Sequence, residues 1–439
     1  MKINEKPSTK KEAGQILVIL ALAIVAIFAF AGLAIDGNRI YAARRLNQST
    51  ADSAALAGAG AAAQYLKSQQ YAVFKCEIPI NTLSAQASDR AITAAEISAE
   101  QDGVDLLRYD LSTHNGVTSI CDSDDKRVYL DVIVQVTTQT PTTFTHLLNI
   151  DSVDTSATAT VRIYPVQSAA YGNALASLKT TCGPDGGIAF GGTSIVNIKQ
   201  GGVFSNSCIV PNGGPTVTVE NGELFYYYTY SYTPIDSITP NPMPTTDRLS
   251  DDLIPPPECK EISYSNASGS SGTKDPGNYL DLSVKANDTL TMNPGLYCLK
   301  GNFKVNANAT VNANGVTLYF INGAPDFSGS AVLTLKAPAA CPSKNCPTQG
   351  VPPAVPGLLI YVDKANASTI TLNGTSFNDY QGTIYAPSSL VKINGTSDSK
   401  TMYTQIISRE ILIDGKANLL MDQLSDDQFK YESSMEMLK

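Results

Sequence analysis

The sequence predicts a mainly β protein in which an N-terminal transmembrane helix and a small α+β module precede a β-solenoid of β-helix type. Three observations support this fold class: an uncharged apolar run, alternating apolar residues after it, and a repeat of short strands in the C-terminal half. Charged residues make up only 16% of the chain and 32 residues are glycine, which favours strands and turns over helical bundles. The expected segments are a cytoplasmic tail at 1–14, an anchor with an alanine-rich helix at 15–65, the α+β module at 66–165, the solenoid at 175–425 and a C-terminal tail at 426–439.

The apolar run, Ile16–Ile35, contains no charged or strongly polar residue. A helix of this length rises roughly 30 Å, the thickness of a hydrocarbon core. Cleaved signal peptides have apolar regions of only about 7–15 residues, so we expect the span to be retained. The alternative is a signal peptide cleaved after Ala29–Ala31, which has the small residues of a cleavage site. Asp36 is expected to mark the outer edge of the bilayer.

The eight cysteines all follow the apolar run, and none forms a C-x-x-C pair or lies beside either histidine. This spacing argues against a zinc site, and we expect no metal or other cofactor. An even set of cysteines favours disulfides in an oxidising compartment, with buried free thiols as the alternative. Because the cysteines fall two by two into separate segments, neighbours are expected to pair; the candidates are Cys76, Cys121, Cys182, Cys208, Cys259, Cys298, Cys341 and Cys346.

The flanking charges are nearly balanced, because four lysines precede the span and three arginines follow it. The cysteines decide the orientation, since disulfides form outside the cytoplasm. We therefore expect a single-pass protein of the cell membrane, with a cytoplasmic N-terminus and extracytoplasmic C-terminal domains. The chain carries a net charge of −9, and its excess of acidic residues lies beyond residue 50. So acidic a bulk argues against nucleic acid as a partner.

A second helical signal follows the span. Four alanines at a spacing of four form one ridge on the predicted helix: Ala51, Ala55, Ala59 and Ala63. Small residues let another helix or a sheet approach closely. The ridge can therefore contact another membrane or filament component, or it can pack on the protein's own ectodomain, and the sequence leaves both alternatives open.

The residues around the span form a pattern over 13–63: Gly14-Gln15, Gly32, Asp36-Gly37, Tyr41, Arg44-Arg45, Leu46 and "ADSAALAGA". This pattern resembles the N-terminal segment of TadE/TadG-like proteins of the Flp (Tad) pilus-assembly system. It implies a retained anchor, an extracytoplasmic C-terminus and partners in a Tad/Flp pilus system. Prepilins carry a glutamate five residues after the cleavage glycine; here that position is Ile19, which favours an anchored TadG-like protein over a pilin. Larger TadG-like chains often contain a metal-binding D-x-S-x-S motif. Here "DLSTH" lacks the second hydroxyl residue of that motif, and "DTSAT" lies inside an alternating strand instead of at the end of one.

The α+β module is predicted from periodicity. Residues 84–103 read as an amphipathic helix, and residues 128–136 alternate apolar and polar as a half-buried strand does. A short helix at 142–150 and a second alternating strand at 152–164 complete the order helix–strand–helix–strand. Cys76 and Cys121 are the candidate staple. His146 is expected to be a surface or packed residue, and the acidic turn at 121–127 lacks the glycine and glutamate of a calcium loop.

The C-terminal half contains an internal repeat. Three nine-residue segments align on Asn-Gly or Asp-Gly pairs that begin at Asn373, Asn394 and Asp414, in steps of 21 and 20 residues. A strand and a turn at this period predict a solenoid whose stacked rungs bury a continuous core. Two proline-rich stretches, 233–257 and 338–356, are expected to be surface excursions.

Many β-helices cleave polysaccharides, but no histidine follows His146 and the acidic pairs lie in excursions or near the end of the chain. We expect a non-enzymatic TadG-like accessory protein that binds or scaffolds, with a carbohydrate-binding or carbohydrate-cleaving surface protein and a structural adhesin unrelated to pili as alternatives. The expected partners are the lipid bilayer, Tad/Flp pilus or other membrane proteins, and cell-surface polysaccharide. The candidate surface for a partner or a glycan is the ladder formed by Tyr226, Tyr228, Tyr230 and Tyr232. The alternative is that these tyrosines form the partly covered face of an edge strand without a binding role.

Overall fold

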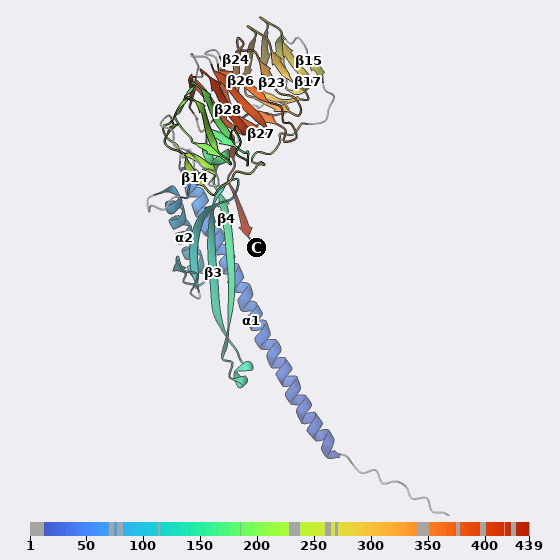
Figure 1. The fold of residues 1–439 in the computed structure, drawn as a ribbon. Coiled ribbons are helices and arrows are strands. Elements are labelled where there is room, and N and C mark those ends of the chain that lie inside the picture. The colour runs from blue at the N-terminus through green and yellow to red at the C-terminus, as the bar shows by residue number, and fades with distance from the viewer. Residues whose placement is uncertain are drawn as a thin grey trace, which may run out of the picture.

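The computed structural model consists of a long helical rod, a small α+β module around one end of the rod, and a β-solenoid beyond that end (Figure 1). It confirms the predicted fold class. The residues that the structure describes are 13–69, 74–76, 82–112, 115–184, 186–227, 238–259, 265–267, 271–339, 351–374, 378–395, 401–416, 418–422 and 427–438.

The rod is a single helix, α1 (Ala13–Ser68), of 56 residues. It continues without a break from the apolar run into the module because no proline interrupts it. Among the described residues, it is the one helix long and apolar enough to cross a membrane, and the side chains of its apolar window, with a mean hydropathy of 3.1, are almost entirely exposed. The helix rises about 1.5 Å per residue, so its outer half extends well beyond the span.

The module packs a second helix and a mostly antiparallel sheet against the outer half of α1. Alternating residues of the long strands face the helices, and Val132, Val134 and Val161 are fully buried there. The predicted helix at 84–103 is α2, whose N-cap Thr82 accepts a hydrogen bond from the Ala85 amide at 3.4 Å. The elements are α2 (Leu83–Gln101), β1 (Leu107–Arg108), β2 (Gly116–Ser123), β3 (Val128–Pro141), the 3₁₀ turn η1 (Thr145–Leu148) and β4 (Ser152–Tyr164).

The C-terminal residues correct the expected tail at 426–439. The chain returns to the module, where β30 (Lys430–Tyr431) pairs with β5 (Gln167–Ser168) and β31 (Ser434–Leu438) pairs with β4. Both pairings are antiparallel. Without β31 the long strand β4 would be an open sheet edge, which proteins usually cover. The N- and C-terminal parts of the chain therefore share one module.

The solenoid has about nine turns built from parallel strands. Its first arm follows the turn η2 (Ala169–Gly172) and contains β6 (Leu175–Ser177), β7 (Ile188–Gly192), β8 (Ile195–Ile198), β9 (Val203–Ser205), β10 (Ile209–Gly213), β11 (Thr216–Val219), β12 (Leu224–Tyr227), β13 (Ile238–Thr239) and β14 (Met243–Thr245).

The second arm contains the predicted repeat and most of the rungs. Its strands are β15 (Ser265–Ala267), β16 (Gly272–Lys274), β17 (Gly277–Val284), β18 (Thr289–Met292), β19 (Gly295–Leu299), β20 (Phe303–Val305), β21 (Thr310–Asn314), β22 (Val316–Phe320), β23 (Pro325–Phe327), β24 (Val332–Lys336), β25 (Leu358–Val362), β26 (Ile370–Gly374), β27 (Asp379–Gly395), β28 (Thr401–Gly415) and β29 (Asn418–Met421).

The chain enters and leaves the solenoid at its middle. Strand β28 pairs with β27 on one side and with β6 and β7 on the other, while β29 pairs with β8. The last rung of the second arm therefore stacks on the first rung of the first arm, where red strands meet green ones in Figure 1. Residues 246–257, called the strap below, lead back from the first arm toward the second. Part of the expected excursion at 233–257 is thus a rung, since β13 and β14 lie within it.

The repeat is in register, as predicted. Asn373 pairs with Asn394, and Asn394 pairs with Asp414. The buried apolar side chains of these strands stack in a column that continues into the first arm, because Ile411 pairs with Ile188 of β7. A rung that lies more than two hundred residues upstream in the sequence thus completes the same apolar column.

Within the described residues, three disulfides join neighbouring cysteines. They are Cys76–Cys121 in the module, and Cys182–Cys208 and Cys259–Cys298 in the solenoid, with Cα–Cα distances of 5.4, 5.4 and 6.1 Å. Sequential pairing is confirmed for these six cysteines. Cys341 and Cys346 lie outside the described residues.

Candidate functional site

The outer half of α1 presents one buried stripe to its own module. The stripe begins with Gly32 and Asp36 at the end of the apolar run and continues through Asn47 and Thr50 into the alanine ridge. Its members recur every three or four residues, which places them on one face of the helix. The module therefore packs along one face of this half of the helix, and the opposite face is exposed to solvent.

The predicted alanine ridge lies inside the module. Ala51, Ala55 and Ala59 are fully buried, and Ala63 packs against the same core. Gly58 lies so close to α2 that a Cβ there would stand 2.6 Å from the Ala91 carbonyl oxygen. Of the two alternatives open from the sequence, the structure shows packing on the protein's own ectodomain.

Two polar residues of the stripe fix how α1 sits on the hairpin β3–β4 and on α2. The Asn47 amide donates to the Thr155 carbonyl at 2.7 Å and accepts from the Thr138 hydroxyl at 3.1 Å. The Thr50 hydroxyl donates to Asp102, at the C-terminal end of α2, at 3.0 Å. Buried polar groups of this kind cost free energy when unpaired, so they favour a single register of helix against sheet.

The end of the stripe next to the apolar run holds the tip of the hairpin. Asp36 accepts hydrogen bonds from the backbone amides of Thr143, Phe144 and Thr145 at 2.9, 2.9 and 2.8 Å, and from the Thr145 hydroxyl at 3.2 Å. Arg39 donates to the Thr143 hydroxyl at 2.6 Å. Burial of Asp36 raises the pKa of its carboxyl group, these hydrogen bonds lower it, and the net pKa lies below its ordinary value.

The sequence alone did not predict this role of Asp36. It was expected to mark the bilayer edge, between Ile16–Ile35 and the ectodomain, and here it also captures a loop more than a hundred residues away. Its spacing of four from Gly32 was the available signal, because a small residue one turn before an acid leaves room for a docked side chain. Asn47 and Thr50 lie on the same face of the helix and were also missed.

The face of α1 that points away from the module is exposed beyond the span. It carries residues at a spacing of three or four: Tyr41, Arg45, Gln48, Asp52 and Leu56. Tyr41 is 64% exposed and Leu56 is 47% exposed. This open stripe, rather than the alanine ridge, is the part of the helix that is accessible to another protein.

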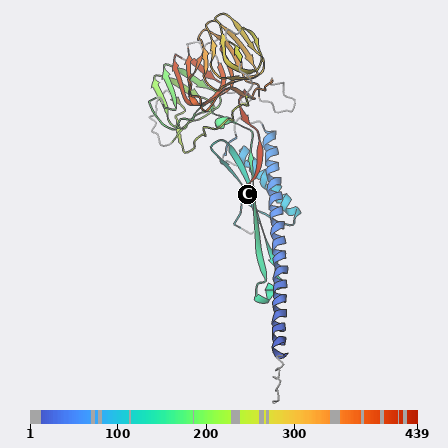
Figure 2. The ribbon, with the colours of Figure 1, turned by 90° about the vertical axis from the view of Figure 1, so that its right-hand side faces the viewer.

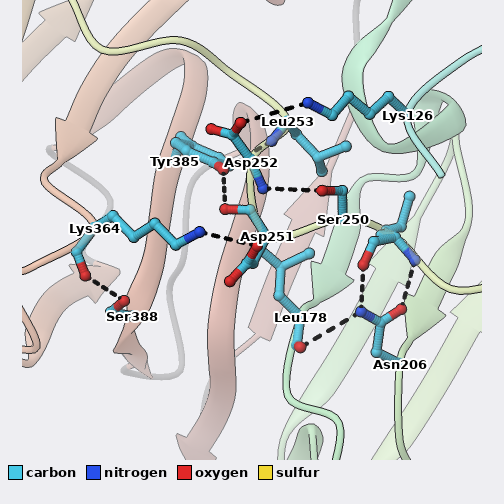
Figure 3. A network of polar contacts seen from close by, with 11 residues as sticks. Lys126, Leu178, Asn206, Ser250, Asp251, Asp252, Leu253, Lys364, Tyr385 and Ser388 are labelled. Carbon is cyan, nitrogen blue, oxygen red and sulfur yellow. Dashed lines mark hydrogen bonds and ion pairs between the residues drawn. The ribbon is translucent and has the colours of Figure 1, made fainter.

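A network of polar contacts joins the strap, the module and the middle rungs of the solenoid (Figure 3). The Asn206 side chain accepts from the Leu249 amide and donates to its carbonyl, both at 2.7 Å. The Tyr385 hydroxyl donates to the Asp251 carbonyl at 2.9 Å and accepts from the Leu253 amide at 3.0 Å. The strap is therefore tied by its backbone to rungs of both arms.

Ion pairs complete this junction. Asp251 pairs with Lys364 of the solenoid at 3.0 Å, and Asp252 pairs with Lys126 of the module at 3.5 Å. A cavity of about 500 Å³ opens beside them, lined by polar residues that include Thr181 and Arg409. Burial raises the pKa of Tyr385 well above its usual range, so its hydroxyl stays a neutral donor. The arrangement is suited to holding the solenoid at a set position on the module.

One face of the second arm is a ladder of short polar side chains. Register pairing aligns Thr273, Thr291, Asn312 and Thr334 across β16, β18, β21 and β24. The neighbouring rows carry opposite charges in pairs, Lys304 with Asp326 and Lys336 with Asp379. In the part of the chain that the structure describes, no group of three His, Cys, Asp or Glu side chains is placed to hold a metal ion.

The tyrosine ladder is represented in the structure by Tyr226, which is half-buried against the solenoid core; Tyr228, Tyr230 and Tyr232 lie outside the described residues. The next residue, Tyr227, was not singled out from the sequence, and the Arg248 guanidinium lies 3.7 Å from its ring centroid. His146 is exposed and pairs with Asp151 at 2.6 Å.

The comparisons with known proteins concern the anchor. Residues 14–63 match the family model of TadE/G-like Flp pilus-assembly proteins. No curated protein and no solved structure gives a significant match. The matched residues are those of α1 from the start of the span to the end of the alanine ridge, and they include the whole stripe from Gly32 to Ala63.

Proposed function

We propose that this chain, whose N-terminal segment is TadE/G-like, is a membrane-anchored, non-enzymatic accessory protein of a Tad/Flp-type pilus-assembly system. It is TadG-like in being anchored rather than assembled as a pilin. The helix α1 crosses the membrane, with the N-terminus in the cytoplasm and the module and solenoid outside it. The solenoid serves there as a surface for binding or scaffolding.

A single observation carries the proposal: the family match coincides with a helix that has both an apolar span and a stripe docked on the module. A free membrane span would leave the ectodomain on a loose linker. Here the helix continues into the core of the module, so the solenoid is held by a rigid rod (Figure 2). An assembly factor that must present a surface at a fixed distance from the membrane benefits from such a rod.

The three disulfides support the proposed orientation, since all of them lie on the C-terminal side of the span. The Thr/Asn ladder of the solenoid supports a binding or scaffolding role, because its hydroxyl and amide groups are hydrogen-bonding groups without the paired free carboxylates of a glycosidase. The acids beside it are held in ion pairs with lysines.

Site-specific photo-crosslinking tests the proposal. A benzophenone amino acid replaces Tyr41, which lies on the open stripe of α1, in cells that carry a Tad/Flp system. We expect adducts with a protein of that pilus system, identified by mass spectrometry. Tyr109 is the matched control, because it is a tyrosine of similar exposure at the far edge of the module.

Two outcomes would count against the proposal. Adducts of equal yield from both positions would indicate random collision, and the absence of pilus-system adducts from Tyr41 would remove the assembly role. Labelling an introduced cysteine at Thr273 with a membrane-impermeant maleimide in intact cells or spheroplasts tests the orientation separately. Protection of that cysteine until the membrane is opened would contradict an extracytoplasmic solenoid.

A further inference from the structure

The tip of the β3–β4 hairpin, residues 142–151, lies beside the apolar span of α1. Figures 1 and 2 both show the hairpin running along the helix and ending in a small turn beside it, away from the rest of the module. The contact residues on the helix are Gly32 and Asp36, one inside Ile16–Ile35 and one directly after it. The module therefore reaches back to the point at which α1 emerges from its apolar segment.

The Phe144 side chain contacts α1 at Gly32, within the apolar segment. Its ring packs so closely on Gly32 that a Cβ at Gly32 would stand 2.4 Å from the ring carbon Cγ. Gly32 precedes Asp36 by four residues, or roughly 6 Å along a helix. A bilayer that covers the apolar segment of α1 must therefore also reach the Phe144 ring, which is still 37% exposed.

Six backbone amides of the tip are already paired. The amides of Thr143, Phe144 and Thr145 donate to Asp36, and those of Thr142, Asn149 and Ile150 donate to carbonyls within the hairpin tip. Unpaired backbone groups are the main obstacle to placing a loop in a membrane. This loop leaves those amides satisfied without water.

The side chains of the tip divide by polarity. Phe144 and Ile150, the latter 45% exposed, supply apolar surface, whereas His146 and Asp151 form an exposed pair and Arg39 stands on the helix above. Aromatic rings, and charged side chains that extend toward the lipid headgroups, are typical of a bilayer interface. The mixture fits the headgroup boundary and not the hydrocarbon centre.

We propose that the hairpin tip inserts into the outer interface of the lipid bilayer beside α1 and forms a second membrane contact. This inference rests on the proposed anchoring of α1 in the membrane. Together the span and the tip hold the rod at two points, which sets its tilt and its rotation about its own axis. The solenoid then faces a defined direction above the membrane.

Tryptophan fluorescence tests this contact, because the chain contains no tryptophan. Single variants Phe144→Trp and Ile150→Trp are placed in nanodiscs of phosphatidylcholine with or without bromine on the acyl chains. We expect the brominated lipid to quench both variants, together with a blue shift of their emission. Using two positions guards against a Phe144 variant that fails to dock on Gly32.

Two further variants separate the possible failures. Phe30→Trp lies within the span and reports whether α1 is in the bilayer. Ile97→Trp lies on the exposed face of α2, far from the membrane, and is expected to remain unquenched. Quenching of Phe30→Trp without quenching at Phe144 or Ile150 overturns the insertion of the tip and leaves the anchor intact. If Phe30→Trp is not quenched either, both proposals fall.

Discussion

The α+β module and the solenoid are both built on a buried apolar interior, but they fill it in opposite ways. The seam between α1 and α2 is made of alanine and glycine, such as Ala59 and Gly58, and backbones nearly touch there. The solenoid interior is made of stacked large side chains, such as Ile411 and Phe190. The module is therefore sensitive to added atoms, and the solenoid to removed ones.

This difference follows from how each region is assembled. A rung of the solenoid meets neighbours that repeat its own pattern, so large residues stack in columns and each column runs over several strands. In the module, by contrast, α1 packs against a second helix of different sequence and against a sheet. Close approach there depends on the smallest side chains.

Removing atoms from the seam where the two arms of the solenoid meet should have the largest effect. Ile411 is buried between Val391 of one rung and Ile188 of the other arm. Ile411→Ala is expected to lower the free energy of unfolding of the solenoid by about 2–5 kcal/mol, because the cavity has no way to collapse fully. Hydrogen exchange measured by mass spectrometry on the whole protein in detergent should show faster exchange in both arms. Loss of protection in one arm alone would contradict the stacking of the arms.

Adding atoms to the module seam is expected to have a smaller but still marked effect. Gly58→Ala places a Cβ against the backbone of α2 and should destabilise the module by about 1–3 kcal/mol through overpacking. Gly60→Ala is the matched control, because nothing lies within 4 Å of a Cβ at that position. The control should be stabilising by about 1 kcal/mol, since alanine is the better helix former. Equal shifts for the two variants in thermal unfolding would refute the tight seam.

Two buried tyrosines of the solenoid should respond oppositely to loss of the hydroxyl. Tyr385→Phe leaves the Leu253 amide and the Asp251 carbonyl without that partner and should cost about 1 kcal/mol for each bond. The Tyr380 hydroxyl is buried and has no hydrogen-bond partner among the described residues. Tyr380→Phe should therefore be neutral or stabilising by about 1 kcal/mol. Urea unfolding compares the two variants, and amide exchange at 249–254 shows whether the strap is released.

The smallest effect is expected at the hairpin tip and depends on pH. Because the folded pKa of Asp36 lies below its ordinary value, the stabilisation is complete above the unfolded pKa and is lost as the pH falls through the folded one. Exchange of the Thr143–Thr145 amides, corrected for the intrinsic effect of pH, should therefore increase only in acid. Asp36→Asn should show high exchange in this segment without the acid transition. A wild-type profile that does not change with pH would be evidence against the carboxylate contact.

Much of this architecture could be predicted because its signals are local. An uncharged run such as Ile16–Ile35 specifies a helix by its own length, and the Asn-Gly repeat at 373 and 394 specifies stacked rungs by its period. Cysteines close in sequence paired as expected because their segments fold together. The solenoid was predicted over 175–425 as one unit, but its rung order was not, because β28 pairs with β6 and β7, which lie far upstream in the sequence.

The sequence by itself determined the anchor helix, the alternation of the module strands and the solenoid class, because each depends on the spacing of apolar residues along one segment. Only the tertiary structure decided that β31 closes the module sheet, that the two solenoid arms meet at β28, and that Asp36 holds the hairpin tip. These contacts join residues that are far apart in the chain. Their free energy comes from burying backbone and side-chain groups of separate segments together, and no single segment carries a signal for its partner.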